Sequence, residues 1–463
     1  MNSNSMSPRS KRVMIPYVFL VFWAYSLILF VLWSSRNLRP IADDYCIATS
    51  VQNGPLAAMG FWWRGWSGDM STMFANVVLV GWPLQELKWS LGSSLPFIAS
   101  CLMVTIFLTT IVRASVIGKF SNSTFRTFST IPFFLLSWWT FWWINKIQNP
   151  ESVQFVATAN ATTLWQNVNT SYVFISSLIM LLLYVIYVRS KKYEGSKWNF
   201  AFFSLSGIFV GFSGAVLSAA ILTYFMLLPI GTWLDGKRIT TRNLSLWITF
   251  NLAMVTSAVL SYFSPGTRYR ATFFPNAPEI NLEIISAFRP TIIPSLLDWW
   301  RVLFSQGMFA TIVMVLVIAI IQVWRGYEFE NKFLQKIAVR VIVFSLILSV
   351  VVGFSELFTQ EAYYHRIPVY LALWIGVMLL AVSCSSHLTR LSPNLSQIVF
   401  VSALGMAIST LAVFTMTDEI SKRYEMWQDG PAPVAHIKDI EEDPGWQRDC
   451  YLALIMQRSG PAR

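Results

Sequence analysis

The chain has 463 residues, of which 55% are hydrophobic and only 12% are charged, and its formal net charge is +11. A soluble protein carries about twice that charged fraction, so the composition argues against an ordinary soluble domain. The basic residues are scattered over short loops and form no single patch, which argues against nucleic-acid binding as the reason for the positive charge.

Long apolar runs separated by short charged loops predict an all-α polytopic membrane protein, because about 20 apolar residues cross a bilayer as a helix. The N-terminal segment MNSNSMSPRSKR leads directly into the first run, and no small-residue cleavage site follows that run. We therefore interpret it as a retained span and not as a signal peptide. Eleven spans are predicted, near 13–33, 91–112, 129–145, 170–188, 199–212, 215–234, 243–264, 303–324, 338–357, 368–385 and 396–417.

The apolar stretch 199–234 is predicted to cross the membrane twice. Its 36 residues would make a helix about 54 Å long, which is too long for one span. Both flanks, RSKKYEGSK and DGKRITTR, are basic and are therefore expected on the cytoplasmic side. Glycine permits a tight turn, so we place the break between Gly211 and Gly214 in VGFSGAV.

Charge supports a topology with the N-terminus inside and the C-terminus outside. The inside segments hold 18 Lys and Arg against 4 Asp and Glu, and the outside segments hold 16 against 19. This asymmetry is what the positive-inside rule expects. The transmembrane domain is thus predicted over 1–417 and a short outer tail over 418–463, with outer loops at 35–90, 146–169, 265–302 and 358–367.

The four cysteines have no metal-ligand spacing. Cys101 and Cys384 fall inside apolar runs and are predicted to be small core residues. Cys46 and Cys450 both fall on the outer side, where a disulfide between them is one option that nothing local requires.

Three tryptophan-containing stretches are predicted as helices lying in the membrane interface. Two belong to the first outer loop, PLAAMGFWWRGWSGDMSTMF and STMFANVVLVGWPL. The third is TIIPSLLDWWRVLF, in which Asp298 and Arg301 are spaced to pair on a helix.

The predicted spans contain almost no ionisable residue, which argues against an ion-coupled transporter or pump. Charges gather instead at outer helix ends, where they are placed to converge on one site. The three groups are Arg36, Arg39, Asp43 and Asp44; Arg268 and Arg270 in SPGTRYRATFFP; and Glu356, Glu361, His365 and Arg366 in SELFTQEAYYHRIP.

Asp43 and Asp44 suit a general base, because adjacent carboxylates disfavour each other's ionisation while nearby arginines favour it. An acidic pair after a helix can equally cap backbone groups or mark the membrane boundary. Arginines bind phosphate through paired hydrogen bonds, and they also anchor helix ends at lipid headgroups. Arg268 and Arg270 would share a face only in an extended segment, and His365 with Arg366 also fits a solvated loop.

The acidic pair soon after the first span, the interfacial helices and the ten or more spans together resemble the GT-C glycosyltransferases. RPIADDYC is similar to the first loop of an ADDYC-type bacterial membrane family related to the serotype-converting O-antigen glucosyltransferases. WSGDMSTMF, SPGTRYR and YYHR are similar to comparable stretches of that family, and the resemblance covers about the first 380 residues.

The resemblance implies an inverting enzyme of the bacterial inner membrane. It would transfer a sugar from a polyprenyl-phosphate donor, such as undecaprenyl phosphate, to a hydroxyl of a cell-envelope glycan or glycolipid on the periplasmic face. One carboxylate, most simply Asp43, would be the base, and fixed positive groups would stabilise the lipid phosphate as it leaves. Arg268, Arg270 and Arg366 match that phosphate role, and the other substrate-binding candidates are Arg36, Arg39, Tyr45, Arg64, Glu361 and His365.

A flippase and a polyprenyl-phosphate glycosyltransferase are the implied pathway partners. The sequence departs from the family pattern at Asp69, where an arginine is expected, and in GFSGAVLSAA, which lacks an expected carboxylate. Asp43, Asp44, Glu356 and Glu361 offer oxygen ligands for a divalent ion. Because arginines can serve the phosphate, we expect no metal and no cofactor.

Two other functions use related substrates. A polyprenyl-linked glycan flippase or exporter would want cationic or polar groups along a path through the membrane, and the apolar spans argue against it. An O-antigen ligase or polymerase would not need an aspartate pair directly after the first span.

Overall fold

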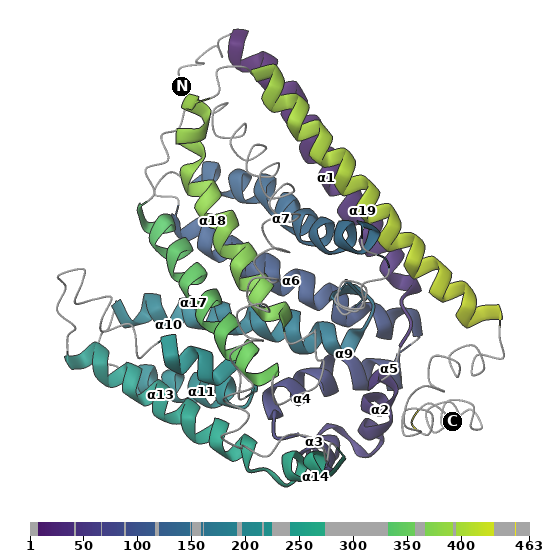
Figure 1. Ribbon diagram of the computed structural model, residues 1–463, viewed down its shortest axis with the longest axis vertical. Helices are drawn as coiled ribbons and strands as arrows, with labels where there is room; N and C mark the ends of the chain where they lie inside the picture. Colours follow the sequence, from purple (N-terminus) through teal and green to yellow (C-terminus); the bar gives the residue numbers. More distant parts are fainter. Residues whose placement is uncertain are drawn as a thin grey trace, which may run out of the picture.

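The described part of the chain is all-helical (Figure 1). A computed structural model describes residues 8–40, 43–65, 67–87, 89–115, 120–148, 150, 159–160, 162–191, 197–214, 217–224, 241–273, 332–356, 366–391, 395–429 and 450. The long helices are α1 (Pro8–Ser34), α6 (Trp89–Ser115), α7 (Phe120–Gln148), α10 (Ile175–Lys191), α11 (Lys197–Gly211), α13 (Thr241–Tyr262), α17 (Lys332–Glu356), α18 (Ile367–Leu391) and α19 (Leu395–Asp429).

Several of these helices are suited to a membrane. Within the described residues, five helical segments are long and apolar enough to cross it, and Ile367–Leu380 is a shorter apolar helix. The five are Val18–Asn37, Leu91–Ile111, Gln166–Arg189, Leu244–Tyr262 and Ala403–Glu425. The prediction of an all-α membrane protein is therefore confirmed. The predicted span 303–324 and the predicted interfacial helix with Asp298 lie outside the described residues.

Helix α7 lies at the centre of the bundle. Every residue from 132 to 143 is buried, as expected for a helix that is apolar all round. Its few hydroxyl groups bind neighbouring helices: Ser137 Oγ accepts from Trp374 Nε1 of α18 at 3.1 Å, and Thr140 Oγ1 donates to Ser409 Oγ of α19 at 3.0 Å. The tryptophan-rich run of α7 is thus core and not an interfacial belt.

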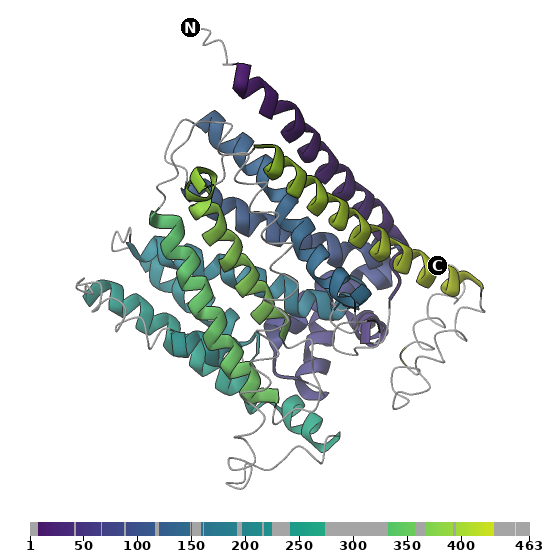
Figure 2. The same ribbon diagram turned by 45° about the horizontal axis from the view of Figure 1, so that its top comes forward.

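Helices α1 and α19 lie side by side and run in the same direction (Figures 1 and 2). The rings of Phe30 and Phe414 are 5.4 Å apart, and further along both helices Arg39 stacks 4.5 Å from the ring of Tyr424. Two membrane spans that run in the same direction are separated in the sequence by an odd number of other spans. The predicted topology has nine spans between its first and eleventh, so the parallel pairing of α1 and α19 agrees with that topology.

Helices α11 and α13 are also parallel neighbours. The rings of Phe203 and Trp247 are 6.0 Å apart, and Gly211, later on α11, faces the backbone of Met254, later on α13. Helix α11 ends at Gly211, a turn follows, and Gly214 has a φ of +135° before helix resumes over 217–224. The predicted break between the two glycines is confirmed, and the parallel pairing requires the chain to return between α11 and α13.

The first outer loop folds into a small unit with its own core. This first-loop unit comprises α2 (Asp43–Ser50), η2 (Val51–Asn53), α3 (Pro55–Gly65), α4 (Met70–Asn76), the π-helical turn η3 (Val77–Gly81) and α5 (Trp82–Glu86). Its core includes Ile47, Trp62, Val77 and Leu84. Phe74, Val78 and Trp82 form an exposed apolar stripe on the opposite face of the α4–α5 helix, which is the amphipathic pattern of an interfacial helix.

The end of α19 differs from the prediction. The last span was predicted to stop at 417 and to give way to a tail, but the helix continues without a break to Asp429. Asp418 pairs with Lys422 at 2.6 Å, and Glu419 pairs with Arg423 at 3.4 Å, each four residues apart. Such pairs support a helix after the apolar sequence ends, so the boundary at 417 is too early.

Candidate functional site

Asp44, the second residue of α2, lies in the interior of the protein. Asp44 is fully buried, and its Oδ1 accepts a hydrogen bond of 2.8 Å from the backbone N–H of Asn167. Asn167 belongs to α9 (Gln166–Val168), which runs through the π-helical turn η4 (Asn169–Phe174) into α10. A helix N-terminus presents unsatisfied N–H groups and partial positive charge. Of the two roles open to the pair, capping is therefore the one that Asp44 has.

Gln166, the neighbour of Asn167, holds the segment just before the pair. Its Nε2 donates to the carbonyl oxygen of Arg39 at 3.1 Å and to that of Leu164 at 3.3 Å. The first turn of α9 thus binds both Arg39 and Asp44. It fixes the connection between α1 and α2 on the surface of the bundle.

Arg39 is itself bound to its surroundings. Its Nη1 donates to the carbonyl oxygens of Leu38 at 2.7 Å and Arg36 at 3.1 Å, and its guanidinium stacks on Tyr424. Burial lowers the pKa of Arg39, while Tyr424 and Tyr45 raise it. An arginine stays charged at neutral pH through such a shift. Arg39 therefore joins α1 to α19 in addition to any contact with a substrate.

Beneath Asp44 lies a chain of polar side chains that the sequence analysis missed. Ser171 Oγ donates to Asn167 Oδ1 at 3.4 Å and accepts from Asn76 Nδ2 at 2.9 Å. The chain connects the last residue of α4, directly before η3, with η4. Both η3 and η4 are π-helical turns, which are frequent at functional sites. Its only sequence signal is the polar run NATTLWQNVNTS at the start of a predicted span.

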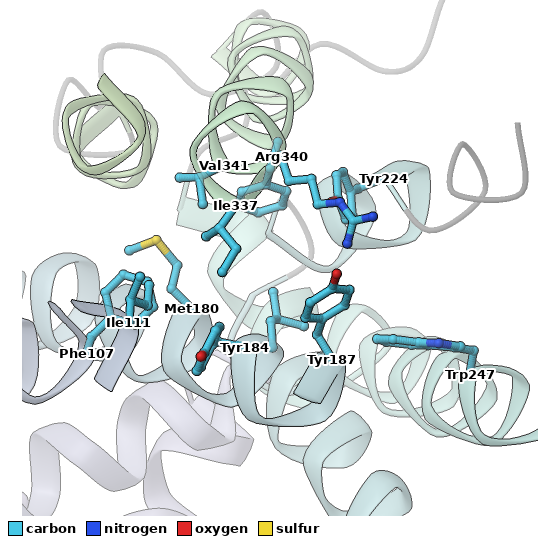
Figure 3. A pocket seen from close by; sticks show the side chains of 12 residues that line it. Phe107, Ile111, Met180, Tyr184, Tyr187, Tyr224, Trp247, Ile337, Arg340 and Val341 are labelled. Atoms are coloured by element: carbon cyan, nitrogen blue, oxygen red, sulfur yellow. The ribbon is translucent and has the colours of Figure 1, made fainter. Parts of the chain in front are cut away.

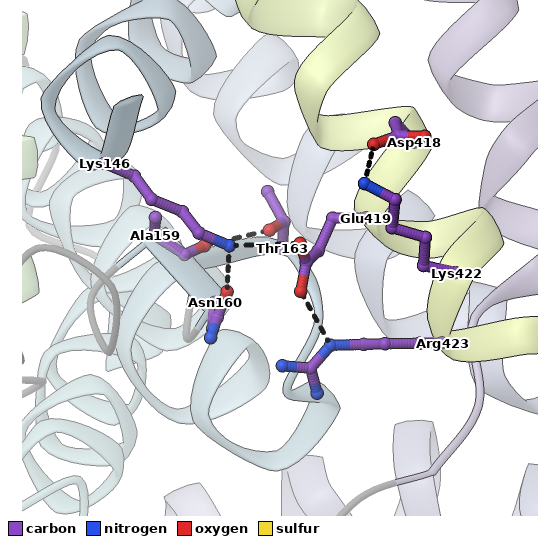
Figure 4. Close-up of polar contacts among 8 residues, drawn as sticks. All are labelled: Lys146, Ala159, Asn160, Thr163, Asp418, Glu419, Lys422 and Arg423. Carbon is purple, nitrogen blue, oxygen red and sulfur yellow. Dashed lines mark hydrogen bonds and ion pairs between the residues drawn. The ribbon is translucent and has the colours of Figure 1, made fainter. Parts of the chain in front are cut away.

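A second polar cluster at the same end was also missed (Figure 4). Lys146, near the end of α7, has its Nζ 3.5 Å from Glu419 Oε2 and 3.3 Å from Asn160 Oδ1. Arg423 Nε donates to Glu419 Oε1 at 3.4 Å. Burial lowers the pKa of Lys146, and Glu419 opposes that shift. The cluster shares the surface of α19 with Tyr424, the contact of Arg39.

Two other predicted site residues of this region, Arg36 and Tyr45, differ in their exposure to solvent. Arg36 is exposed, and its guanidinium lies 3.6 Å from the ring centre of Trp33. Tyr45 is only 1% exposed and packs in the core of the first-loop unit. Its predicted role as a substrate contact stays a prediction, and it would require a substrate to reach into that core.

The arginines of SPGTRYR lie on α14 (Pro265–Phe273), a helix that packs on α3 (Figure 1). Residues two apart on a helix are separated by about 200° around its axis. Arg268 and Arg270 therefore do not share a face of α14. They would share one only if the segment were extended, and α14 is a helix. Arg268 is exposed, as is Arg64 on α3, whose Nε donates to the carbonyl oxygen of Gly60 at 3.1 Å.

The motifs WSGDM and SPGTRYR contact each other. The N–H of Gly68 donates to Thr267 Oγ1 at 3.2 Å, and Ser261 Oγ donates to Asp69 Oδ1 at 3.0 Å. Two residues on, the N–H of Ser71 donates to the carbonyl oxygen of Phe212 at 3.0 Å. The aspartate that departs from the family pattern thus anchors the first-loop unit to α13, beside a contact with the end of α11.

The described members of the three predicted charge groups lie toward the same end of the bundle (Figure 1). The C-terminal ends of α1, α13, α17 and α19 and the start of α18 lie toward the first-loop unit (Figure 1). Arg366 is half-buried at the start of α18, and Glu356 is the last residue of α17. Among the described residues no contact joins Arg64 or Arg268 to Asp44. Glu361 and His365 lie outside the described residues.

The predicted optional disulfide is present. Cys46 of α2 is bonded to Cys450, with a Cα–Cα distance of 4.8 Å, and Thr49 Oγ1 donates to the carbonyl oxygen of Cys450 at 3.0 Å. The C-terminal part of the chain is thereby fixed to the first-loop unit. Within the described part of the chain, no three His, Cys, Asp or Glu side chains gather as metal ligands would, and the metal question stays a prediction.

Comparison with known protein families, with curated proteins and with solved structures finds no match to this chain. The family likeness of its motifs therefore remains a prediction from the sequence.

Proposed function

We propose that the protein is an inverting glycosyltransferase of the GT-C kind, which moves a sugar from a polyprenyl-phosphate donor to a hydroxyl of a cell-envelope glycan or glycolipid. The observation that carries the proposal is the burial of Asp44, one of the two aspartates of the motif. Asp44 is buried against the N-terminus of α9, so we assign the base to Asp43, the first residue of α2. The two carboxylates of the motif then have separate tasks.

In this mechanism Asp43 takes the proton of the acceptor hydroxyl as the hydroxyl oxygen attacks the anomeric carbon. The bond from that carbon to the phosphate oxygen breaks, its electron pair leaves with the lipid phosphate, and the configuration is inverted. Negative charge grows on the phosphate, so a fixed cation stabilises the transition state more than the ground state. Arg36, exposed beside Trp33 at the end of α1, is our first candidate for the cation that stabilises the leaving phosphate. Arg366 is the second candidate for that role.

The disulfide supports placing this site on the periplasmic face of a bacterial inner membrane. Disulfides form and persist in oxidising compartments and are rare in the cytosol. Cys46 lies two residues after Asp44 on α2. A bond at Cys46 therefore favours the same oxidising side for the aspartate pair.

The test is incubation of the purified protein with a panel of radiolabelled undecaprenyl-phosphate sugars, followed by measurement of released lipid phosphate. Loss of a general base lowers the rate by about 10²- to 10⁴-fold, so Asp43→Asn is expected to abolish detectable transfer without changing the melting temperature. Asp44→Asn is expected to lower stability by about 1–2 kcal/mol, because it weakens a buried cap. The matched control is Glu86→Gln, an exposed acid of the same unit, which should change neither.

If the Asp43→Asn and Asp44→Asn enzymes both work at the wild-type rate, the base is elsewhere. The same panel separates the other functions. A flippase or exporter would move the intact lipid-linked glycan without releasing lipid phosphate. An O-antigen ligase or polymerase would transfer from a polyprenyl-diphosphate glycan and leave the monophosphate sugars untouched.

A further inference from the structure

A cavity of about 110 Å³ lies between α6, α10, α13 and α17, far from the first-loop unit (Figure 3). Trp247 lines it, and Ser261, which binds Asp69, is 14 residues further along α13. That separation is about 21 Å along a helix. Arg340 lines it from α17, 16 residues before Glu356, which is about 24 Å. The cavity therefore opens near the opposite end of the bundle.

The lining is almost entirely apolar and aromatic. Phe107, Ile111, Met180, Trp247 and Phe344 are among the residues that form it. Tyr184, Tyr187 and Tyr224 add three hydroxyl groups to a lining that is otherwise apolar apart from Arg340. Hydrocarbon is the chemistry that most of this lining accepts, since apolar walls offer a polar ligand few hydrogen bonds. A cavity of this size takes a segment of one hydrocarbon chain and not a whole lipid.

One cation stands at the edge of this apolar space. Among the described residues that line the cavity, Arg340 is the only charged one, and its guanidinium lies 4.7 Å from the ring centre of Tyr187 (Figure 3). Arg340 is half-buried, and no carboxylate of the described residues pairs with it. A half-buried guanidinium without such an acid is suited to a phosphate oxygen.

The surroundings of Arg340 are basic as well. Lys336 is exposed one turn earlier on α17, and Arg189 lies near the end of α10, which also lines the cavity. In the predicted topology these residues belong to the cytoplasmic side, and Arg340 lies at the inner edge of the span 338–357. Basic residues at that level attract anionic lipids.

We propose that this cavity binds one hydrocarbon chain of a membrane lipid whose anionic phosphate is held by Arg340. The site is separate from the aspartate pair and does not depend on glycosyl transfer. Its ligand is a lipid phosphate, whether a glycerophospholipid or a polyprenyl phosphate supplies it. A zwitterionic headgroup is disfavoured, because its ammonium group would be brought toward Arg340, Lys336 and Arg189.

The experiment uses the purified full chain in detergent with three probes that carry a photoreactive group in the hydrocarbon chain: phosphatidylglycerol, undecaprenyl phosphate and phosphatidylethanolamine. At least one of the two anionic probes is expected to label peptides of α10 and α17. Either anionic probe should label the Arg340→Gln protein about tenfold less, because a charge-assisted phosphate contact accounts for about that factor. Phosphatidylethanolamine should also label the wild type about tenfold less, because its ammonium group is repelled by the same cations. Lys336→Gln removes the same charge one turn away and should stay within about twofold of wild type.

A second variant, Met180→Phe, fills the cavity and leaves the charges unchanged, so it should reduce labelling without altering the preference for anionic probes. Labelling by both anionic probes indicates that the site recognises the lipid phosphate. Labelling by undecaprenyl phosphate and not by phosphatidylglycerol indicates that the site also recognises the polyprenyl chain. Equal labelling by phosphatidylethanolamine overturns the proposal. So does equal labelling of wild type and Arg340→Gln, or labelling that maps outside the cavity.

Discussion

Lys146 is a partly buried cation whose charge is matched by Glu419 on another helix. The side chain of Lys146 is 15% exposed, and that of Glu419 is 30% exposed. Removing one partner of such a pair leaves the other charge desolvated and uncompensated. We expect Glu419→Gln to lower the free energy of unfolding by about 1–2 kcal/mol, measured from tryptophan fluorescence during thermal unfolding in detergent.

The adjacent residue provides the control. Asp418 pairs with Lys422, and both side chains are more than half exposed at 58% and 63%. Solvent already screens that pair, so Asp418→Asn should leave the melting temperature unchanged. Equal destabilisation by the two substitutions would mean that the helix, and not the contact with Lys146, is the source of the effect.

Sequence reasoning identified the aspartate pair but could not divide its roles. Adjacent acids look alike in a sequence, and the partner of Asp44, the N–H of Asn167, is 123 positions away. Lys146 and Glu419 were missed for the same reason, since no local pattern connects residues on α7 and α19. Such contacts form only when distant helices pack together, so the spacing of residues within one helix cannot predict them.

At the scale of elements, the close approach of α11 and α13 depends on glycine. A Cβ at Gly207 would overlap the carbonyl oxygen of Phe250, and part of the backbone would have to move. Forcing a methyl group into a packed interface costs about 1–3 kcal/mol, so Gly207→Ala should lower the melting temperature clearly. The matched control is Gly65→Ala at the end of α3, where a Cβ meets nothing within 4 Å.

In the control, Gly65→Ala should leave the stability unchanged or raise it slightly, because alanine has a higher helix propensity than glycine. Thermal unfolding of both variants, with wild type beside them, measures the difference. A Gly207→Ala protein as stable as wild type would show that the two helices are not packed this closely.

The break between α11 and the following helix was predictable because two independent signals agreed. Basic flanks on both sides demanded an even number of crossings, and glycines supplied the turn. The first-loop unit was not predictable as a core, since Trp62 and Val77 look like interfacial residues until α3 and η3 pack against α2. The extent of α19 was misjudged because charged residues after an apolar run resemble a loop, whereas here they pair along one helix face.

At the scale of the whole molecule, the C-terminal ends of α1 and α19 and residue Cys450 lie toward the first-loop unit (Figure 1). α1 and α19 run together, Arg39 stacks on Tyr424, and Cys450 is bonded to Cys46. Residues separated by 404 positions are thus covalently joined. The disulfide brings Cys450 to the helix that carries Asp43 and Asp44, so Cys450 belongs to the surroundings of the candidate site.

This closure can be tested by cutting the chain. A protease site placed within 231–240, between the cysteines, should give fragments that remain joined on a non-reducing denaturing gel and separate after reduction. Cys46→Ser should release the fragments without reductant. Cys101→Ser, which alters the free thiol of α6, should leave them joined.

The same gel also tests the side of the membrane. A disulfide formed in the periplasm depends on that compartment's oxidising system, because the cytosol keeps thiols reduced. In bacteria lacking the periplasmic disulfide oxidase, the cleaved fragments are expected to separate without reductant. Fragments that stay joined in those cells, with thiols blocked at lysis, would count against the periplasmic placement of α2 and with it against a periplasmic site at Asp43.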